Sequence, residues 1–212
     1  MTTEELIAAL VADLPTRRHP PQALLPAAVL ASVVWAGAAL TLTIGVRPDL
    51  AIVAGTGAFL FKFVVTITLA ATALGLVRSS FSPGFPSTPA PWILLFAPAL
   101  LAVAVVIELQ TLDSGLWAMA ATGKNRLLCL VAIPALGIVP LGGLILVLRR
   151  GAPMRPTLAG FYAGTLAGGI AATAYALYCT DDSALFMATC YSPAIAALAG
   201  LGAVLGRRLL RW

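Results

Sequence analysis

Long apolar stretches separated by short polar joins dominate the pattern of this chain. Each of six stretches has about 20 residues or more, the length that an α-helix needs to cross a hydrocarbon core of ~30 Å. They cover residues 25–46, 51–77, 92–110, 127–148, 157–178 and 184–205. A buried helix of a soluble protein can be equally apolar, but six in succession with short joins favour membrane spans. The pattern predicts an all-α, polytopic membrane protein built as a bundle of six transmembrane helices.

The composition agrees with this prediction. The chain has 212 residues and is 60% hydrophobic but only 10% charged, whereas a soluble domain carries roughly 25% charged residues. The formal net charge of +5 does not indicate nucleic acid, because the basic residues stand in short clusters between the apolar stretches. No phosphate-binding loop, catalytic triad or dinucleotide fingerprint is present, so we expect a protein that is not an enzyme and needs no small-molecule substrate.

The basic clusters alternate between the two sides of the predicted bundle. One side holds Arg17, Arg18, Arg78, Arg149, Arg150, Arg155, Arg207, Arg208 and Arg211. The other side holds Arg47, Lys124 and Arg126. Cytoplasmic loops carry the excess of basic residues. We therefore expect both termini in the cytoplasm, with a cytoplasmic segment at residues 1–22 and a transmembrane domain at residues 23–212.

The N-terminal segment has the pattern of a short amphipathic helix. Thr2 and Glu5 have the spacing of a capping box, and Pro15 ends the pattern. The apolar positions recur at helical spacing, and the expected partner-binding set is Leu6, Ile7, Leu10, Val11, Asp13 and Leu14. Surface-seeking helices usually carry basic residues on the polar face, whereas this one is acidic. Docking into a groove of a cytosolic partner is favoured, with membrane binding or packing on the bundle as the alternative.

Two cysteines are predicted to lie at matched depth near the outer face. Cys129 is 20 residues from Arg149 and Cys179 is 23 residues from Pro156, which corresponds to ~30 Å and ~34 Å of helix. Thiols on that side meet an oxidising compartment, where they form a disulfide or bind a soft metal ion. Cysteine is also a small apolar filler, and the two interpretations are evenly balanced for this pair. For Cys190 alone the filler interpretation is favoured.

One acid and one base fall at membrane depth. Lys62 lies in the middle of the second apolar stretch, where an unpaired charge is costly, and Glu108 lies in the third. Side chains lean toward the N-terminus of their helix, so these two lean toward each other. We expect a buried structural ion pair between Lys62 and Glu108. The alternative is a proton or ion relay in a small transporter or channel.

Small residues in the fifth stretch predict close helix packing. Gly160, Gly164 and Gly168 form two overlapping GxxxG spacings, which let two helix backbones approach each other. We expect this contact within the bundle rather than between two chains.

Several segments together give the chain a family resemblance. They are Gly45-Val46-Arg47-Pro48-Asp49-Leu50, Phe61-Lys62, Leu128-Cys129-Leu130, Arg149-Arg150-Gly151-Ala152-Pro153 and Ala172-Thr173-Ala174-Tyr175-Ala176-Leu177-Tyr178-Cys179, with Glu4-Glu5-Leu6-Ile7 at the start. The chain resembles the NrsF family, six-helix anti-sigma factors of the bacterial inner membrane, over nearly its whole length.

The resemblance implies a partner and a signal. Members hold an extracytoplasmic-function sigma factor at the membrane through the cytoplasmic N-terminal segment. Two periplasm-side cysteines, matching Cys129 and Cys179, are associated with sensing metal or oxidative stress. The resemblance implies no resident cofactor, only a transient heavy-metal ion at these thiols. Cys190 matches no position of the pattern.

Overall fold

The computed structural model describes residues 2–12, 21–81, 90–151 and 153–210. All regular secondary structure in these ranges is helical, which confirms the all-α prediction. The α-helices are α1 Thr3–Ala12, α2 Leu25–Thr43, α3 Leu50–Val53, α4 Gly57–Ser79, α5 Phe96–Thr111, α6 Trp117–Thr122, α7 Arg126–Arg149, α8 Pro156–Ala176, α9 Ala184–Phe186 and α10 Ser192–Leu209. Short 3-10 turns cover Pro21–Leu24, Pro91–Leu95 and Ser114–Leu116, and a π-helical turn at Met187–Tyr191 joins α9 to α10.

The second apolar stretch is broken, where a single helix over residues 51–77 was expected. The short helix α3 stops at Val53, and α4 begins at Gly57. Thr56 caps α4: its backbone is extended, and its hydroxyl accepts a hydrogen bond from the N–H of Phe59. Two flanking glycines and a good N-cap residue outweigh the apolar pattern, so the helix starts several residues later than predicted.

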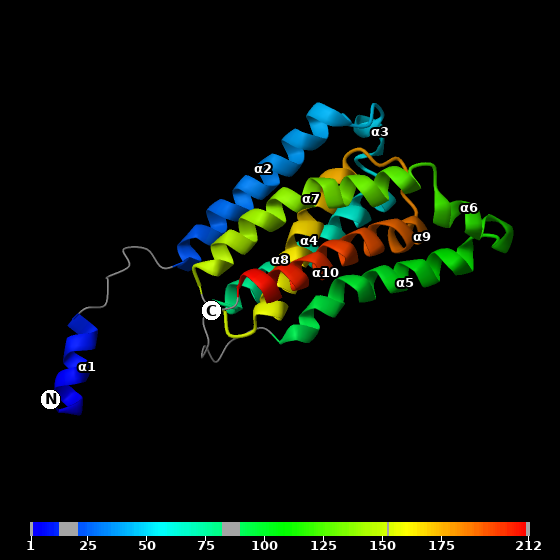
Figure 1. Cartoon of the computed structure of the whole chain (residues 1–212). Coiled ribbons are helices and arrows are strands. Elements are labelled where there is room, and N and C mark those ends of the chain that lie inside the picture. The colour runs from blue at the N-terminus through cyan, green and yellow to red at the C-terminus, as the bar shows by residue number, and fades with distance from the viewer. Residues whose placement is uncertain (1, 13–20, 82–89, 152, 211–212) are drawn as a thin grey trace.

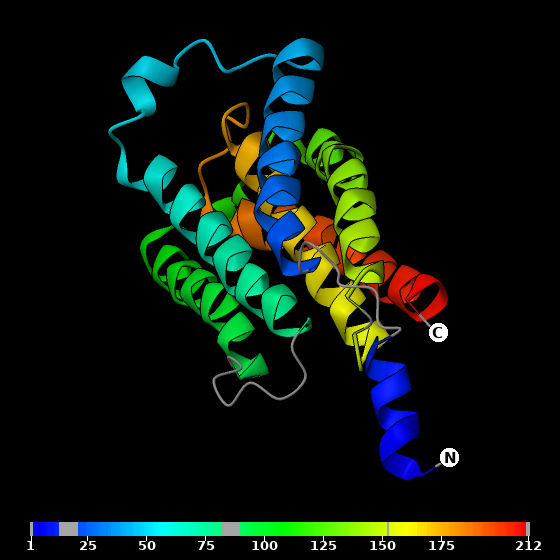
Figure 2. The ribbon, with the colours of Figure 1, turned by 90° about the vertical axis from the view of Figure 1, so that its left-hand side faces the viewer.

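Helix α8 is the centre of the bundle. Helices α4, α7 and α10 pack closely against it, and α2 contacts it as well. In the turned view of Figure 2, α4 and α5 lie to one side of α2 and α7 lies to the other, with α8 behind. Most residues of α8 are buried. Pro156 occupies the first position of α8, where its missing N–H costs no hydrogen bond.

Glycines make the contact between α8 and α10 possible. A side chain at Gly160 would overlap the carbonyl oxygen of Gly202, and one at Gly164 would overlap that of Leu198. Gly202 and Gly206 face α8 in the same way from the other helix. The GxxxG spacings therefore serve packing within the bundle, as the sequence predicted.

Five helical segments in the described part of the chain are long and apolar enough to cross a membrane. They are Gln22–Thr43, Gly57–Ser79, Pro91–Thr111, Ser114–Arg149 and Ala184–Leu209. Helix α8, the expected fifth span, is not among them. Its glycines, threonines and alanines suit a helix enclosed by protein, because a helix shielded from lipid needs no large aliphatic surface.

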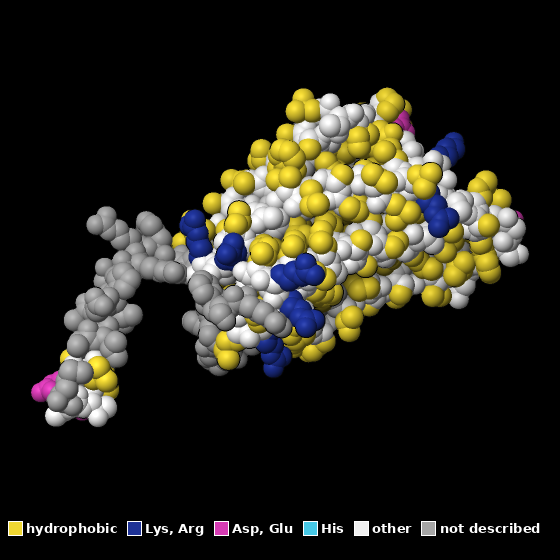
Figure 3. All heavy atoms as spheres, viewed as in Figure 1, with side chains coloured by type: hydrophobic (Ala, Val, Ile, Leu, Met, Phe, Trp, Pro, Cys, Tyr) yellow, Lys and Arg dark blue, Asp and Glu magenta, His cyan; other side chains and the backbone are white. Residues whose placement is uncertain are grey.

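The outer surface of the bundle is apolar along its length. Several side chains along α2, α5 and α7 are 59–67% exposed: Leu30, Val34, Val103, Val131 and Leu146. Figure 3 shows the same apolar character over the middle of one face of the bundle, between the basic side chains at its two ends. Soluble monomers rarely expose contiguous apolar surface of this extent. The surface fits a lipid environment.

The two ends of the bundle differ in charge. The start of α2, the end of α10 and the join between α7 and α8 lie at the end nearest α1 (Figure 1). Arginine side chains gather at that end in Figure 3, where the last turns of α4, α7 and α10 carry Arg78, Arg149, Arg207 and Arg208. The opposite end carries α3, α6 and the loop between α8 and α9.

Candidate functional site

The N-terminal helix α1 stands apart from the bundle (Figure 1). Its first turn is closed by the predicted capping box: the N–H of Thr2 donates to the Glu5 carboxylate (2.8 Å) and the N–H of Glu5 donates to the Thr2 hydroxyl (3.4 Å). The described side chains from Thr2 to Ala8 are all exposed, with Leu6 at 44% and Ile7 at 56%. An apolar edge is thus displayed to the surroundings.

The remaining members of the expected partner-binding set are only partly described. Leu10 and Val11 belong to α1, which extends to Ala12. Asp13 and Leu14 lie outside the described residues. Acidic side chains occupy the first turn of α1, where they interact favourably with the positive end of the helix dipole.

A cluster of charges around two buried cations lies at the opposite end of the bundle. We call it the Asp182 cluster: Arg47, Asp49, Lys62, Asp182 and the backbone carbonyl of Cys179. Lys62 is fully buried and Arg47 is 5% exposed. Buried cations of this kind are tolerated only when they are paired and hydrogen-bonded, and both conditions are met here.

Lys62 binds the loop that follows α8. Its Nζ lies 2.5 Å from the Asp182 carboxylate and donates to the carbonyl oxygens of Cys179 (2.9 Å) and Asp181 (3.3 Å). All three donor positions of the ammonium group are therefore occupied. Phe59, one turn earlier in α4, places its ring 5.7 Å from Nζ.

Arg47 binds the same loop from another direction. Its guanidinium donates to both carboxylate oxygens of Asp49 at 2.8 Å, and its Nη1 donates to Asp182 (3.3 Å) and to the carbonyl of Cys179 (3.2 Å). The hydrogen bonds from Arg47 hold the pKa of Asp49 below its ordinary value. The Cys179 carbonyl thus accepts from two buried cations at once.

The predicted ion pair between Lys62 and Glu108 is wrong. Lys62 pairs with Asp182 instead, and Glu108 accepts hydrogen bonds from the Ser183 hydroxyl (2.6 Å) and the Leu185 N–H (3.0 Å). The loop after α8 folds in between and supplies partners for both charges. The transporter or channel alternative relied on a polar path through Lys62 and Glu108, and in the structure each of these two side chains has its own partners in the segment after α8.

Asp181 fixes the same loop to α7. Its carboxylate accepts hydrogen bonds from the backbone N–H groups of Lys124 (3.2 Å) and Asn125 (3.1 Å), just before α7 begins. The side-chain amide of Asn125 adds a further bond at 3.3 Å. A carboxylate at this position satisfies amide groups that the helix itself leaves unpaired. The loop is therefore tied to α4, α5 and α7 at once.

All three cysteines are free and fully buried. Cys129 lies in the first turn of α7, and Cys179 follows α8 at the same end of the bundle, as their predicted depths required. The Cys179 thiol donates a weak hydrogen bond to the Asp181 carbonyl (3.7 Å), and burial raises its pKa. Cys190 lies in the π-helical turn, with its sulfur 3.6 Å from the Thr189 hydroxyl.

No metal site is preformed in the described part of the chain. It contains no cluster of three or more histidine, cysteine, aspartate or glutamate side chains able to hold a metal ion. The donor set that the sequence offered, Cys129 and Cys179, supplies two soft ligands, which suits thiophilic ions better than hard ones.

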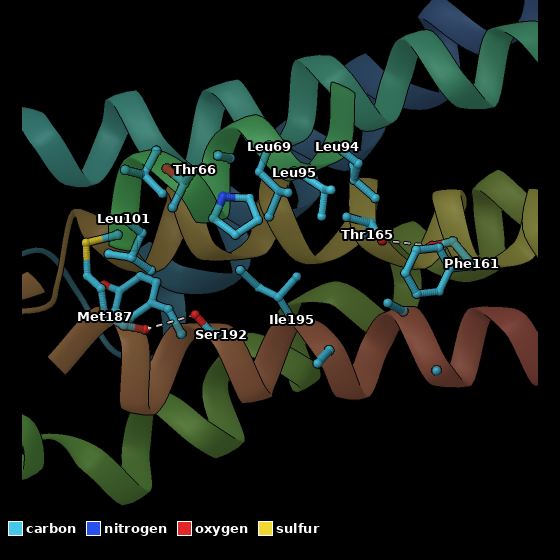
Figure 4. Close-up of a pocket in the computed structure, with 17 residues that line it drawn as sticks. Thr66, Leu69, Leu94, Leu95, Leu101, Phe161, Thr165, Met187, Ser192 and Ile195 are labelled. Carbon is cyan, nitrogen blue, oxygen red and sulfur yellow. Dashed lines mark hydrogen bonds between the residues drawn. The ribbon is translucent and has the colours of Figure 1, made fainter. Parts of the chain in front are cut away.

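An apolar pocket of about 380 Å³ opens between α4, α5, α8 and α10 (Figure 4). Its lining includes Leu69, Leu94, Leu101, Phe161 and Ile195. Each serine and threonine hydroxyl in the lining donates a hydrogen bond to a backbone carbonyl of its own helical segment, as the dashed lines at Thr165 and Ser192 show. The lining is mainly apolar, so the pocket offers contact chiefly to hydrocarbon chains.

Comparison with known proteins adds an independent finding. The family described as "NrsF: Negative regulator of sigma F" matches residues 10–212 of this chain. The chain is 34% identical to the "Anti-sigma-F factor NrsF" of Caulobacter vibrioides and 30% identical to the "Probable anti-sigma-F factor NrsF" of Azospira oryzae. Each similarity covers 100% of both chains. No solved structure matches the chain.

Proposed function

The chain belongs to the NrsF family, negative regulators of sigma F, and on that premise we propose that it is a membrane-embedded anti-sigma factor that captures an extracytoplasmic-function sigma factor through α1. The family is regulatory rather than enzymatic. Capture would keep the sigma factor at the membrane and away from RNA polymerase. The exposed apolar edge of α1, standing apart from the bundle, is the observation that carries this proposal.

The properties of α1 support a role in binding. A helix of ten residues is marginally stable in water, and an apolar stripe on it gains free energy only when a partner covers it. The stripe is continuous at helical spacing, which is the pattern of a helix that docks into a hydrophobic groove. The capping box prepares the helix for docking by reducing the entropy lost on binding.

The two ends of the bundle support a cytoplasmic α1. The arginine-rich end is the end nearest α1, and an excess of basic residues marks the cytoplasmic side of a membrane protein. We infer six membrane spans in a bacterial inner membrane, with α8 as the enclosed span among five apolar ones. Both termini then lie in the cytoplasm.

We further infer that Cys129 and Cys179 receive the signal from the outer side. They would bind a soft metal ion, or be oxidised to a disulfide with two protons and two electrons passing to an external oxidant. Both thiols are fully buried, so a reagent would reach them only when the outer end opens. The signal then shifts the bundle toward that open state by binding or trapping it.

Deleting residues 2–14 tests the capture proposal. Membranes that contain the full chain should retain the sigma factor in a pull-down, and the deletion should abolish its retention. A sharper pair is Ile7→Glu against Ala8→Glu, because Ala8 lies about 130° from the centre of the apolar stripe on a helix of 3.6 residues per turn.

The two single variants should differ strongly. Burial of an isoleucine side chain contributes about 1.5–3 kcal/mol, so Ile7→Glu should weaken capture by roughly 10- to 100-fold. Ala8→Glu should leave it nearly unchanged. Equal capture by all variants would refute a role for α1.

A second test concerns the thiols. Cys129→Ser combined with Cys179→Ser should preserve capture and abolish stress-induced release. A fully inducible double variant would refute the sensing proposal.

A further inference from the structure

Two buried cations converge on one peptide group, and that peptide group belongs to Cys179. The carbonyl oxygen of Cys179 accepts from Lys62 Nζ at 2.9 Å and from Arg47 Nη1 at 3.2 Å. Both cations also contact Asp182, three residues further along. The backbone before Cys179 is held too, since the N–H of Arg47 donates to the carbonyl of Leu177 (3.3 Å).

The cluster joins segments that are far apart in the sequence. Lys62 comes from α4, Arg47 and Asp49 come from the join between α2 and α3, and Asp182 comes from the loop after α8. The loop cannot move outward without removing Asp182 and the Cys179 carbonyl from these cations. A cation left buried without partners is strongly disfavoured. The closed loop and the present position of α4 are therefore mutually dependent.

Helix α4 reaches from this cluster to the other end of the bundle. It runs from Gly57 to Ser79, about 34 Å of helix. Two residues beyond it, the ring of Phe81 packs against Gly151 at the join between α7 and α8, where any side chain at Gly151 would overlap the ring. A displacement of Lys62 thus acts on a rigid element whose far end touches the arginine-rich face.

We propose that the Asp182 cluster is a latch that holds Cys179 closed and couples its displacement to α4. Lys62, Arg47 and Asp182 are positioning residues for the sensing thiol. The coupling half of this inference rests on the proposed function, whereas the latch half does not. Opening of the loop exposes Cys179 and removes the partners of Lys62 in the same step, so the state that admits a thiol reagent is also the state in which α4 is released.

Thiol labelling of the full chain in native membranes tests the latch. In a background with Cys129→Ala and Cys190→Ala, Cys179 is the only thiol, and its rate of reaction with a small membrane-impermeant maleimide reports opening of the loop. Lys62→Met replaces the buried ammonium by an apolar side chain of similar length and leaves Arg47 to pair with Asp182. The labelling rate should rise at least tenfold in Lys62→Met and further in Asp182→Asn.

Two controls separate a latch from general damage. Lys124→Met removes an exposed charge at the same end and should not change the rate. Asp182→Glu keeps the carboxylate at a position that is 23% exposed and should restore slow labelling, which a merely disrupted fold would not do. Unchanged labelling in both Lys62→Met and Asp182→Asn would overturn the latch.

Capture by the same variants tests the coupling. Lys62→Met should weaken sigma-factor capture about tenfold with α1 intact, whereas Ile7→Glu should weaken capture by the roughly 10- to 100-fold given above with no change in Cys179 labelling. Faster labelling with unaltered capture would overturn the coupling to α4. If the unmodified chain captures no sigma factor, the proposed function fails, and the labelling rates still decide whether the latch exists.

Discussion

Helix α1 and the Asp182 cluster are opposite in almost every physical respect. The described side chains from Thr2 to Ala8 are exposed, and the capping-box hydrogen bonds lie within the first turn of α1. The cluster buries two cations completely or nearly so, and it ties the loop after α8 to distant segments. Helix α1 is accessible to a partner, whereas the Asp182 cluster is held in place by many simultaneous contacts.

This difference has a physical basis in the environment of each region. A short helix in water exchanges its polar groups with solvent at little cost, so few internal bonds are needed. In the hydrocarbon core of a membrane, no water is present to form hydrogen bonds with an unpaired charge or peptide group. Under the proposed function, a regulator that binds a partner through α1 and senses a signal at the opposite end would gain from this asymmetry.

The largest effect on stability is expected from disrupting the contact between α8 and α10 in the bundle that carries both regions. Gly202→Val places a side chain against the Gly160 carbonyl at the crossing of α8 and α10, whereas Gly200→Val points into open space. Overpacking typically costs about 1–3 kcal/mol, and a backbone obstacle puts Gly202→Val at or above the upper value. Thermal unfolding in detergent should show a large loss for Gly202→Val and almost none for Gly200→Val. Equal stability of the two variants would contradict a role for Gly202 in the close contact between α8 and α10.

A smaller effect is expected at the outer end of α7. Asp181→Ala removes the carboxylate that accepts from Lys124 and Asn125, and loss of such a cap costs about 0.5–2 kcal/mol. Asp113→Ala is the matched control, since Asp113 precedes a short helical turn without a side-chain cap bond. Thermal unfolding should detect the first change and not the second. A null result for Asp181→Ala would mean that α7 does not depend on this loop.

The smallest effect on capture is expected from weakening the capping box of α1. Thr2→Ala removes one half of the capping box, which is worth about 1 kcal/mol of helix stability. Because α1 must be helical to dock, capture should weaken about fivefold. Thr3→Ala, one position later and without a capping bond to Glu5, should leave capture unaltered. Binding titrations on reconstituted protein would resolve this difference, and identical affinities would argue that α1 is ordered by its partner alone.

Local patterns in the sequence were sufficient for much of the fold. The apolar stretches predicted the long helices, Thr2 and Glu5 predicted the capping box, and the glycines of α8 predicted the close contact with α10. Each of these features depends on residues a few positions apart, where helical geometry fixes which side chains meet.

The partners of Lys62 could not be predicted in the same way. Its contacts come from residues about 120 positions away. They lie in a loop, and the path of a loop cannot be predicted from a periodic pattern in the sequence. Glu108 was the only acid at comparable depth within a helix, so the loop acids were overlooked. The sequence does contain a signal: the pair Asp181-Asp182 begins two residues after Cys179, at the end of the bundle toward which the Lys62 side chain leans.

The most direct test of the account is the side of the membrane on which each region lies. In a chain whose native cysteines are replaced by alanine, Thr3→Cys reports α1 and Lys124→Cys reports the opposite end, and both positions are exposed. With an impermeant maleimide on intact cells, Lys124→Cys should label at once and Thr3→Cys only after the membrane is permeabilised. Labelling of Thr3→Cys in intact cells would place α1 outside, where it can reach no cytosolic sigma factor.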